Sequence, residues 1–386
     1  MGVSHTHDHE DIVYPATIPF VLVHLTGLAA IWTGVTAQAL LVAFALYVIR
    51  MFAVTGGYHR YFSHRSYKTS RFGQFVLAFL CQSSAQRGVV WWAAIHRHHH
   101  LHSDTEHDVH SPRHHGFLYS HVGWIFAPSS AKPDYGTVRD LTKNPEIAFL
   151  DRFTYTPAFL LAFGLWLWGG WPMLVVGFFW STIALYHGTF FINSLAHVVG
   201  SQRYLTGDDS RNNFWLALIT MGEGWHNNHH HYQSSARQGF KWWEIDMTYY
   251  ILKALSWTGL IWDLRAPPEA IMRGERPVGR KVVEKVAGEL AAAFTVDSYA
   301  DRVREAWAES HKVEDLTEFA RKARGQLEER LAEMSLPHLP TIPEIREKAE
   351  EMFSETPSLD AIVYRAHELL ALAVAAHVCD QALAAA

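Results

Sequence analysis

Two long stretches of the chain contain no Asp, Glu, Lys or Arg, and this feature limits the possible folds more than any other. The first covers residues 12–49 and the second covers residues 153–202. A membrane-spanning helix needs about 20 apolar residues, so each stretch can hold two helices. Each stretch also has a turn signal near its middle, Thr33-Gly34 in the first and Gly169-Gly170 in the second. The sequence therefore predicts an all-α membrane protein with four spans, at residues 17–32, 36–54, 155–168 and 172–192.

The orientation of these spans follows from their flanking residues. Tryptophans cluster at the two proposed outer turns, as is typical of a membrane interface. Basic residues are absent from these turns and occur at the opposite ends of the spans, where we find Arg60, Arg65, Lys68, Arg71 and Arg203. By the positive-inside rule, both termini and the loops between the hairpins face the cytoplasm. An alternative is a large soluble helical core with unusually apolar hairpins.

The composition excludes several other classes of protein. The net charge of −5 is too balanced to suggest nucleic-acid binding. The chain has two cysteines, Cys81 and Cys379, which lie far apart, so we expect no disulfide scaffold, iron–sulfur cluster or cysteine zinc site. No cleavable signal peptide is expected. The mean hydropathy of −0.04 does not argue against membrane spans, because the rest of the chain is rich in charge and histidine.

The chain divides into three parts by composition. Residues 1–14 form a polar tail, expected to be disordered, with alternating His5, His7 and His9. Residues 15–275 form the membrane domain, in which residues 72–95 are expected to be one helix at the membrane interface. The character changes near Val278, and residues 276–386 are expected to form a soluble C-terminal extension of amphipathic helices. We find no chemical motif in this extension.

Histidine is the abundant residue, with 26 copies, and many of them lie in three clusters beside the expected spans. Residues at i, i+3 and i+4 share one face of a helix, so the HxxHH spacing lets three imidazoles converge. The first cluster, His59 and His64, has i+5 spacing and is expected to straddle a frayed helix end loosened by Gly56-Gly57. The clusters and a further element after the fourth span contain His59, His64, His96, His99, His100, Asn193, His197, His226, His229 and His230.

Imidazole is a common ligand of iron, zinc and copper. Nine histidines exceed the needs of one tetrahedral site, so we expect two metals. A zinc enzyme would use fewer histidines, and a redox pair with positions open to O₂ fits better. His98 and His231 lie outside the HxxHH spacing, so we do not expect them to be metal ligands. The remaining loop histidines are expected to face solvent or to lie around the ligands; they are His107, His110, His114, His115 and His121.

At these residues the sequence resembles the membrane fatty-acid desaturase family, of the stearoyl-CoA desaturase type. The resemblance rests on HxxxxH followed by two HxxHH motifs, and on the flanking sequences GYHRYFSHRSY, HSPRHHGFLYSHVGW, NSLAH and GEGWHNNHH. It covers about residues 15–265, and the length and flanks are more similar to a bacterial member, which would place the protein in a bacterial inner membrane.

The resemblance implies a diiron cap on the cytoplasmic side. One iron would be held by His59, His64, His96, His100 and His229. The other would be held by His99, His197, His226 and His230, with Asn193 contacting it through a water. Zinc can replace iron during overexpression. The resemblance also implies that the acyl tunnel ends at the second span, where counting back from His59 reaches Met51 and Tyr47.

The implied reaction is insertion of a cis double bond, at the delta-9 position, into a long-chain acyl-CoA with O₂ and two electrons. Animal members carry an Arg-Asp pair where this chain has Ala94 and Ile95, so a lipid or carrier-protein ester is the alternative. We find no haem, cysteine or dinucleotide motif, so the electron donor is expected to be a separate ferredoxin, flavin reductase or cytochrome b5-type protein. The rival functions are a diiron membrane hydroxylase and a histidine-rich metal transporter, whose ligands should lie at mid-span.

Overall fold

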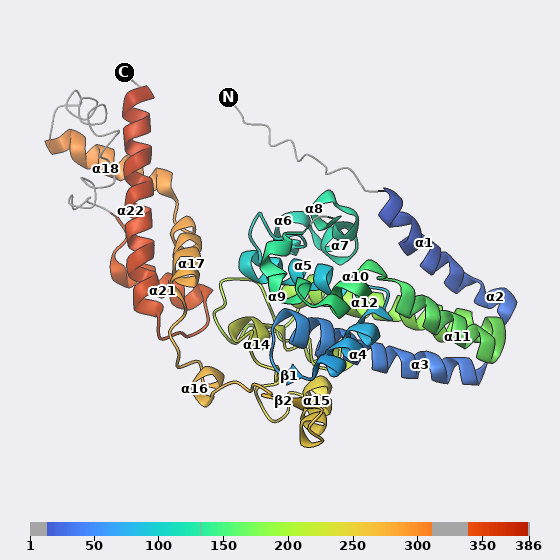
Figure 1. The fold of residues 1–386 in the computed structure, drawn as a ribbon. Coiled ribbons are helices and arrows are strands. Elements are labelled where there is room, and N and C mark those ends of the chain that lie inside the picture. The colour runs from blue at the N-terminus through green and yellow to red at the C-terminus, as the bar shows by residue number, and fades with distance from the viewer. Residues whose placement is uncertain (1–13, 132, 311–338, 385–386) are drawn as a thin grey trace. The chain divides into compact units, whose positions relative to one another are not determined.

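The computed structural model describes residues 14–384 except residue 132 and residues 311–338 (Figure 1). The described chain is mostly helical, as predicted, and its sheet has two short antiparallel strands, β1 (Lys68–Thr69) and β2 (Ile261–Trp262). It divides into two compact units. The first contains residues 1–203 and 208–272, and the second contains residues 204–207 and 273–386. The polar N-terminal tail lies outside the described residues.

The first apolar stretch forms α1 (Tyr14–Leu28), α2 (Ala30–Thr33) and α3 (Ala37–Phe52). Gly34 takes a positive φ of 79° at the predicted turn, and Thr36 caps α3 by accepting a hydrogen bond from the backbone of Ala39. The π-helix η1 (Ala53–Ser63) continues α3 without a break, which gives an apolar helix of 27 residues.

The second apolar stretch forms α11 (Thr156–Pro172), η4 (Met173–Trp180), α12 (Ser181–Ser194) and the short turn η5 (Leu195–His197). The predicted turn is confirmed, because Gly169 and Gly170 leave the helical conformation. Gly170 has a φ of 66°, which a residue with a Cβ adopts only at a cost, and α11 folds back on η4 there.

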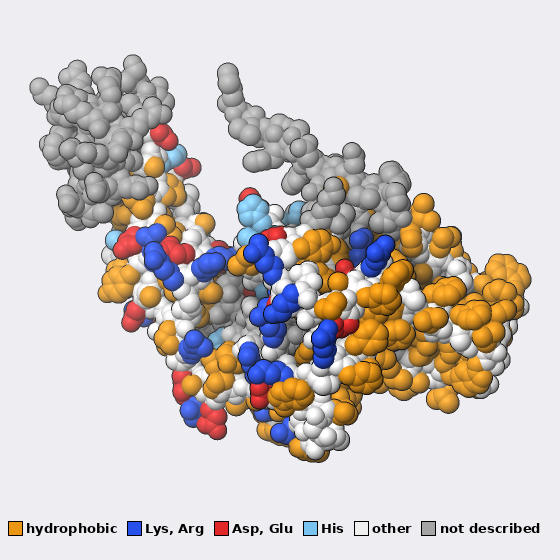
Figure 2. Space-filling model, in the orientation of Figure 1, with side chains coloured by type: hydrophobic (Ala, Val, Ile, Leu, Met, Phe, Trp, Pro, Cys, Tyr) orange, Lys and Arg blue, Asp and Glu red, His pale blue; other side chains and the backbone are white. Residues whose placement is uncertain are grey.

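Apolar side chains cover the outside of these hairpins. Leu41 and Phe44 on α3 are both 68% exposed, and Phe159, Leu167 and Trp168 on α11 are also exposed. Figure 2 shows this apolar surface as a broad orange area over α3 and α11. An exposed apolar surface of this extent is typical of contact with lipid.

Three helices in the described chain are long and apolar enough to cross a membrane. They cover residues 37–63, 156–197 and 359–378, and the second of them contains the Gly169-Gly170 turn. Residues 18–33 form a shorter apolar helix.

The interval 72–95 differs from the expected single helix. It contains α4 (Arg71–Gln82) and α5 (Val89–His102), separated by a turn in which Ala85 and Arg87 have positive φ. Ser70 caps α4, and the buried Gln82 side chain donates to the carbonyls of Leu150 and Thr154. The polar run from Gln82 to Arg87 lies at this break, and it was interpreted as an interruption within one interfacial helix rather than as its end.

The rest of the first unit consists of shorter elements. They are α6 (Pro112–His115), α7 (Phe117–His121), η2 (Gly123–Phe126), α8 (Pro128–Ala131), η3 (Tyr135–Val138), α9 (Arg139–Thr142), α10 (Pro145–Arg152), α13 (Phe214–Ile219), α14 (His226–His231), α15 (Met247–Trp257) and α16 (Glu269–Met272).

The second unit contains α17 (Arg280–Ala292), α18 (Val296–Ser310), α21 (Ile342–Met352) and α22 (Leu359–Ala384). Its core is formed by Leu205, Leu290, Ile345, Ile362 and Leu370, among others. The apolar stripe of α22 is therefore covered by protein within this unit, although its length and composition also suit a membrane span. Residues 311–338 of the expected helical extension lie outside the described residues.

We expect a chain truncated after residue 275 to keep its metals and its activity with excess reductant. The second unit has a separate core, and its described helices carry no histidine from the clusters beside the spans. The measurement is metal content and turnover of the truncated protein beside the full chain. A truncated protein that folds and keeps its metals but has no turnover would show that the extension takes part in the chemistry.

Candidate metal centre

Nine histidines converge in the first unit and form two adjacent groups. The first group is His59, His64, His96, His100 and His229, and the second group is His99, His197, His226 and His230. Within each group, the ring nitrogens lie within 4.8 Å of one another. These are the same two sets that the family resemblance implied.

The first group shows why His59 and His64 have i+5 spacing. The prediction of a frayed helix end is wrong, because η1 runs through Gly56-Gly57 and the backbone N–H of His64 donates to the carbonyl of His59 at 3.1 Å. In a π-helix, residues i and i+5 are hydrogen-bonded neighbours along one side. The two imidazoles consequently approach each other, with ring centroids 4.7 Å apart.

The HxxHH motifs lie on α5 and α14, as their spacing predicts. The Nε2 atoms of His96 and His100 are 3.0 Å apart, and the rings of His226 and His230 have centroids 4.4 Å apart. The Nε2 atoms of His197 and His226 are 3.1 Å apart. Because His99 and His100 belong to different groups, one helix contributes to both.

Four buried carboxylates orient these histidines, and sequence reasoning missed all of them. His99 Nδ1 lies 3.1 Å from Asp108, and His59 Nδ1 lies 2.6 Å from Glu223. The corresponding distances are 2.8 Å for His197 with Asp104 and for His230 with Asp208. A carboxylate that accepts from Nδ1–H fixes the tautomer that presents Nε2 to a metal. The motif spacing gives no sign of this, because each carboxylate lies in a loop.

The protonation states suit a metal as well. Burial, followed by repulsion from neighbouring histidines, lowers the pKa of His64, His96 and His100 well below the usual value, so these imidazoles are neutral. Burial raises the pKa of Glu223, but His59 and Arg60 lower it more, and the result is about 2. Burial also raises the pKa of Asp104 and Asp208, but the histidines beside them, together with hydrogen bonds from serine and backbone donors, lower it more, so the net shift is downward.

The donor set therefore fits two divalent metals. His230 Nε2 is buried and has no hydrogen-bond partner in the described chain, while its Nδ1 is held by Asp208. A buried imidazole nitrogen without a partner is costly unless something binds it. The ionised carboxylates behind the histidines would offset part of the positive charge of the metals.

A buried arginine connects this centre to the fold. Arg60 is fully buried and donates to Glu223 at 3.0 Å, to Asp246 at 2.9 Å and to the carbonyl of Ala236 at 2.6 Å. Asp246 also caps α15 by accepting from the backbone of Tyr249. Arg60 thus holds Glu223 in place behind His59.

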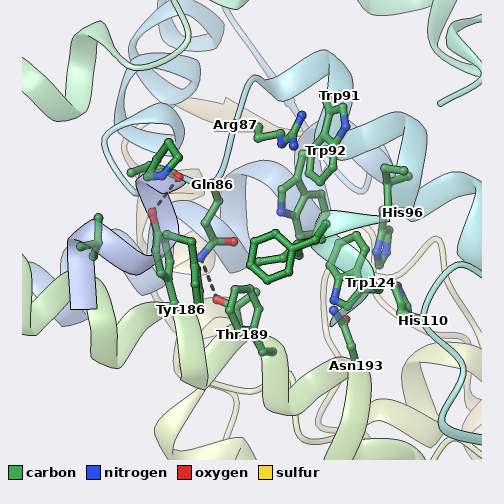
Figure 3. A pocket seen from close by; sticks show the side chains of 18 of the residues that line it. Gln86, Arg87, Trp91, Trp92, His96, His110, Trp124, Tyr186, Thr189 and Asn193 are labelled. Atoms are coloured by element: carbon green, nitrogen blue, oxygen red, sulfur yellow. Dashed lines mark hydrogen bonds between the residues drawn. The ribbon is translucent and has the colours of Figure 1, made fainter. Parts of the chain in front are cut away.

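A cavity of about 560 Å³ leads to the first group (Figure 3). It is lined mostly by apolar and aromatic residues of α1, α5, η2 and α12, with His96, His110 and Asn193 at the metal side. The Gln86 side chain crosses to α12 and donates to Thr189 Oγ1 at 3.0 Å. Trp92 stacks between Tyr58 and His96, with centroid distances of 5.3 and 5.0 Å. This volume and lining are typical of a site for a small apolar ligand.

Met51 and Tyr47 do not line this cavity, and both pack beside Gly188 of α12. Met51 is fully buried, and the Tyr47 hydroxyl donates to the carbonyl of Ile219 at 2.5 Å. A smaller cavity of about 30 Å³ next to His59 is lined by Val54 and Thr55, about one turn beyond Met51.

The loop histidines divide into two kinds. His107, His114 and His115 are exposed or partly exposed, in agreement with the prediction. His110 is buried, with its ring centroid 4.4 Å from that of His99, and burial lowers its pKa to about 3. His121 is also buried, and its Nε2 lies 3.0 Å from Nδ1 of His187.

Helical hairpins with exposed apolar faces and two histidine groups with carboxylates behind them are the features of a membrane protein that can hold two metal ions. The sequence matches the fatty acid desaturase family over residues 21–259, and the chain belongs to this family. The prediction of a fatty acid desaturase, made from the resemblance, is thereby confirmed.

Curated relatives include desaturases with different acyl carriers. An acyl-CoA 5-desaturase from Anemone leveillei is 37% identical over 64% of this chain and 74% of its own length. An sn-1 stearoyl-lipid 9-desaturase from Synechocystis is 38% identical over 66% of this chain and 80% of its own length. A palmitoyl-monogalactosyldiacylglycerol delta-7 desaturase from Arabidopsis thaliana is 38% identical over 60% of this chain and 64% of its own length.

Proposed function

We propose that the protein inserts a cis double bond, at the delta-9 position, into a saturated long-chain acyl group. The observation that carries this proposal is an apolar cavity that reaches His96 of the first histidine group, beside which the second group lies. A saturated methylene has no acidic proton and no leaving group, so acid–base catalysis cannot open it. Two iron ions in the histidine groups would supply the activation of O₂ that the reaction needs.

The residues of the chain bind and orient the substrate. The cavity would hold the acyl chain away from water, which protects a reactive centre from side reactions. The Gln86–Thr189 hydrogen bond and the Trp92 ring shape its wall beside His96. Asn193, which lines both cavities, would contact the second metal through a water, as the resemblance implies. The two electrons would come from a separate ferredoxin, flavin reductase or cytochrome b5-type protein.

The membrane arrangement proposed here has four spans, with the histidine groups and both termini on the cytoplasmic side of a bacterial inner membrane. The turns at Gly34 and Gly170 support two hairpins. The basic residues Arg65, Lys68 and Arg71 lie at the histidine-bearing ends and are exposed, which supports the cytoplasmic side.

Acyl-CoA is the first substrate to test, and an acyl lipid is the second. Both kinds are named among the relatives. Among the described residues that line the cavity, Arg87 is the one Lys or Arg, and the buried Ala94 and Ile95 offer no charge. CoA carries several phosphates, so the single basic residue at the cavity keeps an acyl lipid as the alternative carrier.

The experiment uses the iron-loaded protein in lipid nanodiscs, with a reductase, O₂ and either stearoyl-CoA or a stearoyl phospholipid. Mass spectrometry of the acyl product should show the loss of two hydrogens and one cis double bond with one of the two carriers. A product with an added oxygen would instead show a hydroxylase. No oxidised product with either carrier would contradict the proposal.

Met51→Ala is expected to shift the chain-length preference toward longer acyl groups without moving the double bond. The change would extend the small cavity at Val54 and Thr55 by about two or three methylenes, each of which gains roughly 0.8 kcal/mol on burial. About 1.4 kcal/mol corresponds to tenfold in preference. The measurement is competition between acyl chains of different length in a stable, metal-loaded variant. Unchanged product ratios in Met51→Ala and Tyr47→Ala would show that the second span does not limit the length of the acyl chain.

A further inference from the structure

One wall of the large cavity belongs to α1, the first helix of the first apolar hairpin. Pro19, Phe20 and Val23 of this helix line the cavity. The side chains of Tyr186 and Thr189, on α12, point into the same cavity (Figure 3). The cavity that reaches the first histidine group therefore lies partly between two helices that the sequence predicts to be membrane spans.

The cavity opens at the surface near the starts of α1 and α11. Two of its lining residues are exposed: Pro19, in the second turn of α1, and Tyr155, which directly precedes α11 and is 54% exposed. Large apolar side chains on the same two helices are exposed next to them, Leu22 on α1 and Phe159 on α11. The opening is thus continuous with the apolar surface that is typical of contact with lipid.

Hydrogen bonds hold the second half of α1 to its neighbours. His24 Nε2 lies 3.1 Å from Nε2 of His187 on α12. Trp180, at the end of η4, donates from its indole N–H to the carbonyl of Gly27 at 2.9 Å. Both links lie beyond the residues of α1 that border the opening, so they fix the helix without closing the cavity.

At the cavity itself, α1 makes contacts between aromatic rings. Phe20 follows Pro19 directly, and its ring centroid lies 5.4 Å from that of Phe126 on η2 and 6.1 Å from that of Tyr186 on α12. Apolar contacts of this kind are not directional. Because a side chain changes rotamer much faster than a helix moves, rotation of Phe20 can widen the path from the opening while the hydrogen bonds of α1 remain intact.

We propose that the acyl chain of a membrane lipid enters the cavity sideways from the bilayer, through the opening between α1 and α11, and that Phe20 closes this entry. The inference rests on the proposed function and names a lipid ester as its substrate class. The apolar border of the opening suits a chain that already lies in the bilayer, whereas a CoA ester would have to bring charged phosphates to the same border at a cost. Since Pro19 and Tyr155 lie near the proposed cytoplasmic ends of their helices, the ester would stay at the membrane interface.

The test uses the full-length, iron-loaded protein in nanodiscs that contain a phosphatidylcholine with a photoreactive diazirine in the middle of one acyl chain. Illumination followed by mass spectrometry identifies the labelled residues, and this readout requires no turnover. We expect label on Tyr186 and Phe190 inside the cavity, and on Leu41 and Phe44 at the outer surface. Val23→Trp fills the cavity, so the inner label should be lost while the outer label is unchanged.

The matched control is Leu22→Trp, which adds the same side chain to the exposed face of α1 and should keep the inner label. Phe20→Ala should raise the inner label, and the turnover of a stearoyl phospholipid, at least twofold. Unchanged metal content shows that each variant is folded.

Inner label that is absent, or that Val23→Trp does not reduce, would overturn the proposed entry. Conversion of stearoyl-CoA by a protein without inner label would overturn the entry and leave the proposed function intact. Inner label without an oxidised product from either carrier would support the entry and contradict the proposed function, so the two failures are distinguishable.

Discussion

Replacing Arg60 by methionine is expected to destabilise the protein by about 3–5 kcal/mol, the usual cost of removing one partner of a buried ion pair. Arg60 is fully buried between Glu223 and Asp246, with donor–acceptor distances of 3.0 and 2.9 Å. Without the guanidinium, the carboxylates of Glu223 and Asp246 remain buried and lose the cation that they share. Because whole domains are stable by only about 5–15 kcal/mol, the variant should accumulate poorly and lose its metals.

The matched control is Arg71→Met. Arg71 forms a similar pair with Glu146 at 2.7 Å, but its side chain is 74% exposed, and ion pairs in solvent contribute little to stability. The measurement is the thermal midpoint of both variants in the same detergent, with metal content. If Arg60→Met melts within a degree or two of Arg71→Met, the buried network does not stabilise the fold as argued.

Asp104→Asn is expected to weaken metal binding in the second histidine group by about 10–100-fold, the usual effect of removing an orienting partner of a metal ligand. The Asp104 carboxylate lies 2.8 Å from Nδ1 of His197 and also accepts from Ser111 Oγ and from the backbone N–H of Asp209. An amide can no longer accept from all three, and its NH₂ group can face His197.

The measurement for this variant is metal content after equilibration with limiting iron. It should fall from two toward one per chain, because the first group keeps Glu223 behind His59. Asp209→Asn is the control, since its carboxylate pairs with Arg113 rather than with a histidine. Equal metal content in Asp104→Asn and the unchanged protein would show that the carboxylate does not orient His197.

The parts of this centre that follow helix periodicity could be predicted from the sequence. The i, i+4 pairs His96/His100 and His226/His230 lie on helices and converge, because short-range spacing fixes which side chains share a face. The turns at Gly34 and Gly170 were also visible, since glycine between two apolar runs is a local signal.

The parts that depend on tertiary contacts could not be predicted. The i+5 spacing of His59 and His64 was interpreted as a frayed end, whereas the π-helix is maintained in a wholly buried environment around Tyr58, Arg60 and Phe62. Helix periodicity gives no signal for the orienting carboxylates, because loops bring them to their histidines. These carboxylates are Asp104, Asp108, Asp208 and Glu223. The break between α4 and α5 was missed for the same reason, since Gln82 finds its partners about 70 residues away.

The central claim is that two neighbouring histidine groups hold two irons, and elemental analysis of active protein tests it most directly. The account predicts two irons per chain in preparations with full turnover. Full turnover with one metal atom per chain would contradict it.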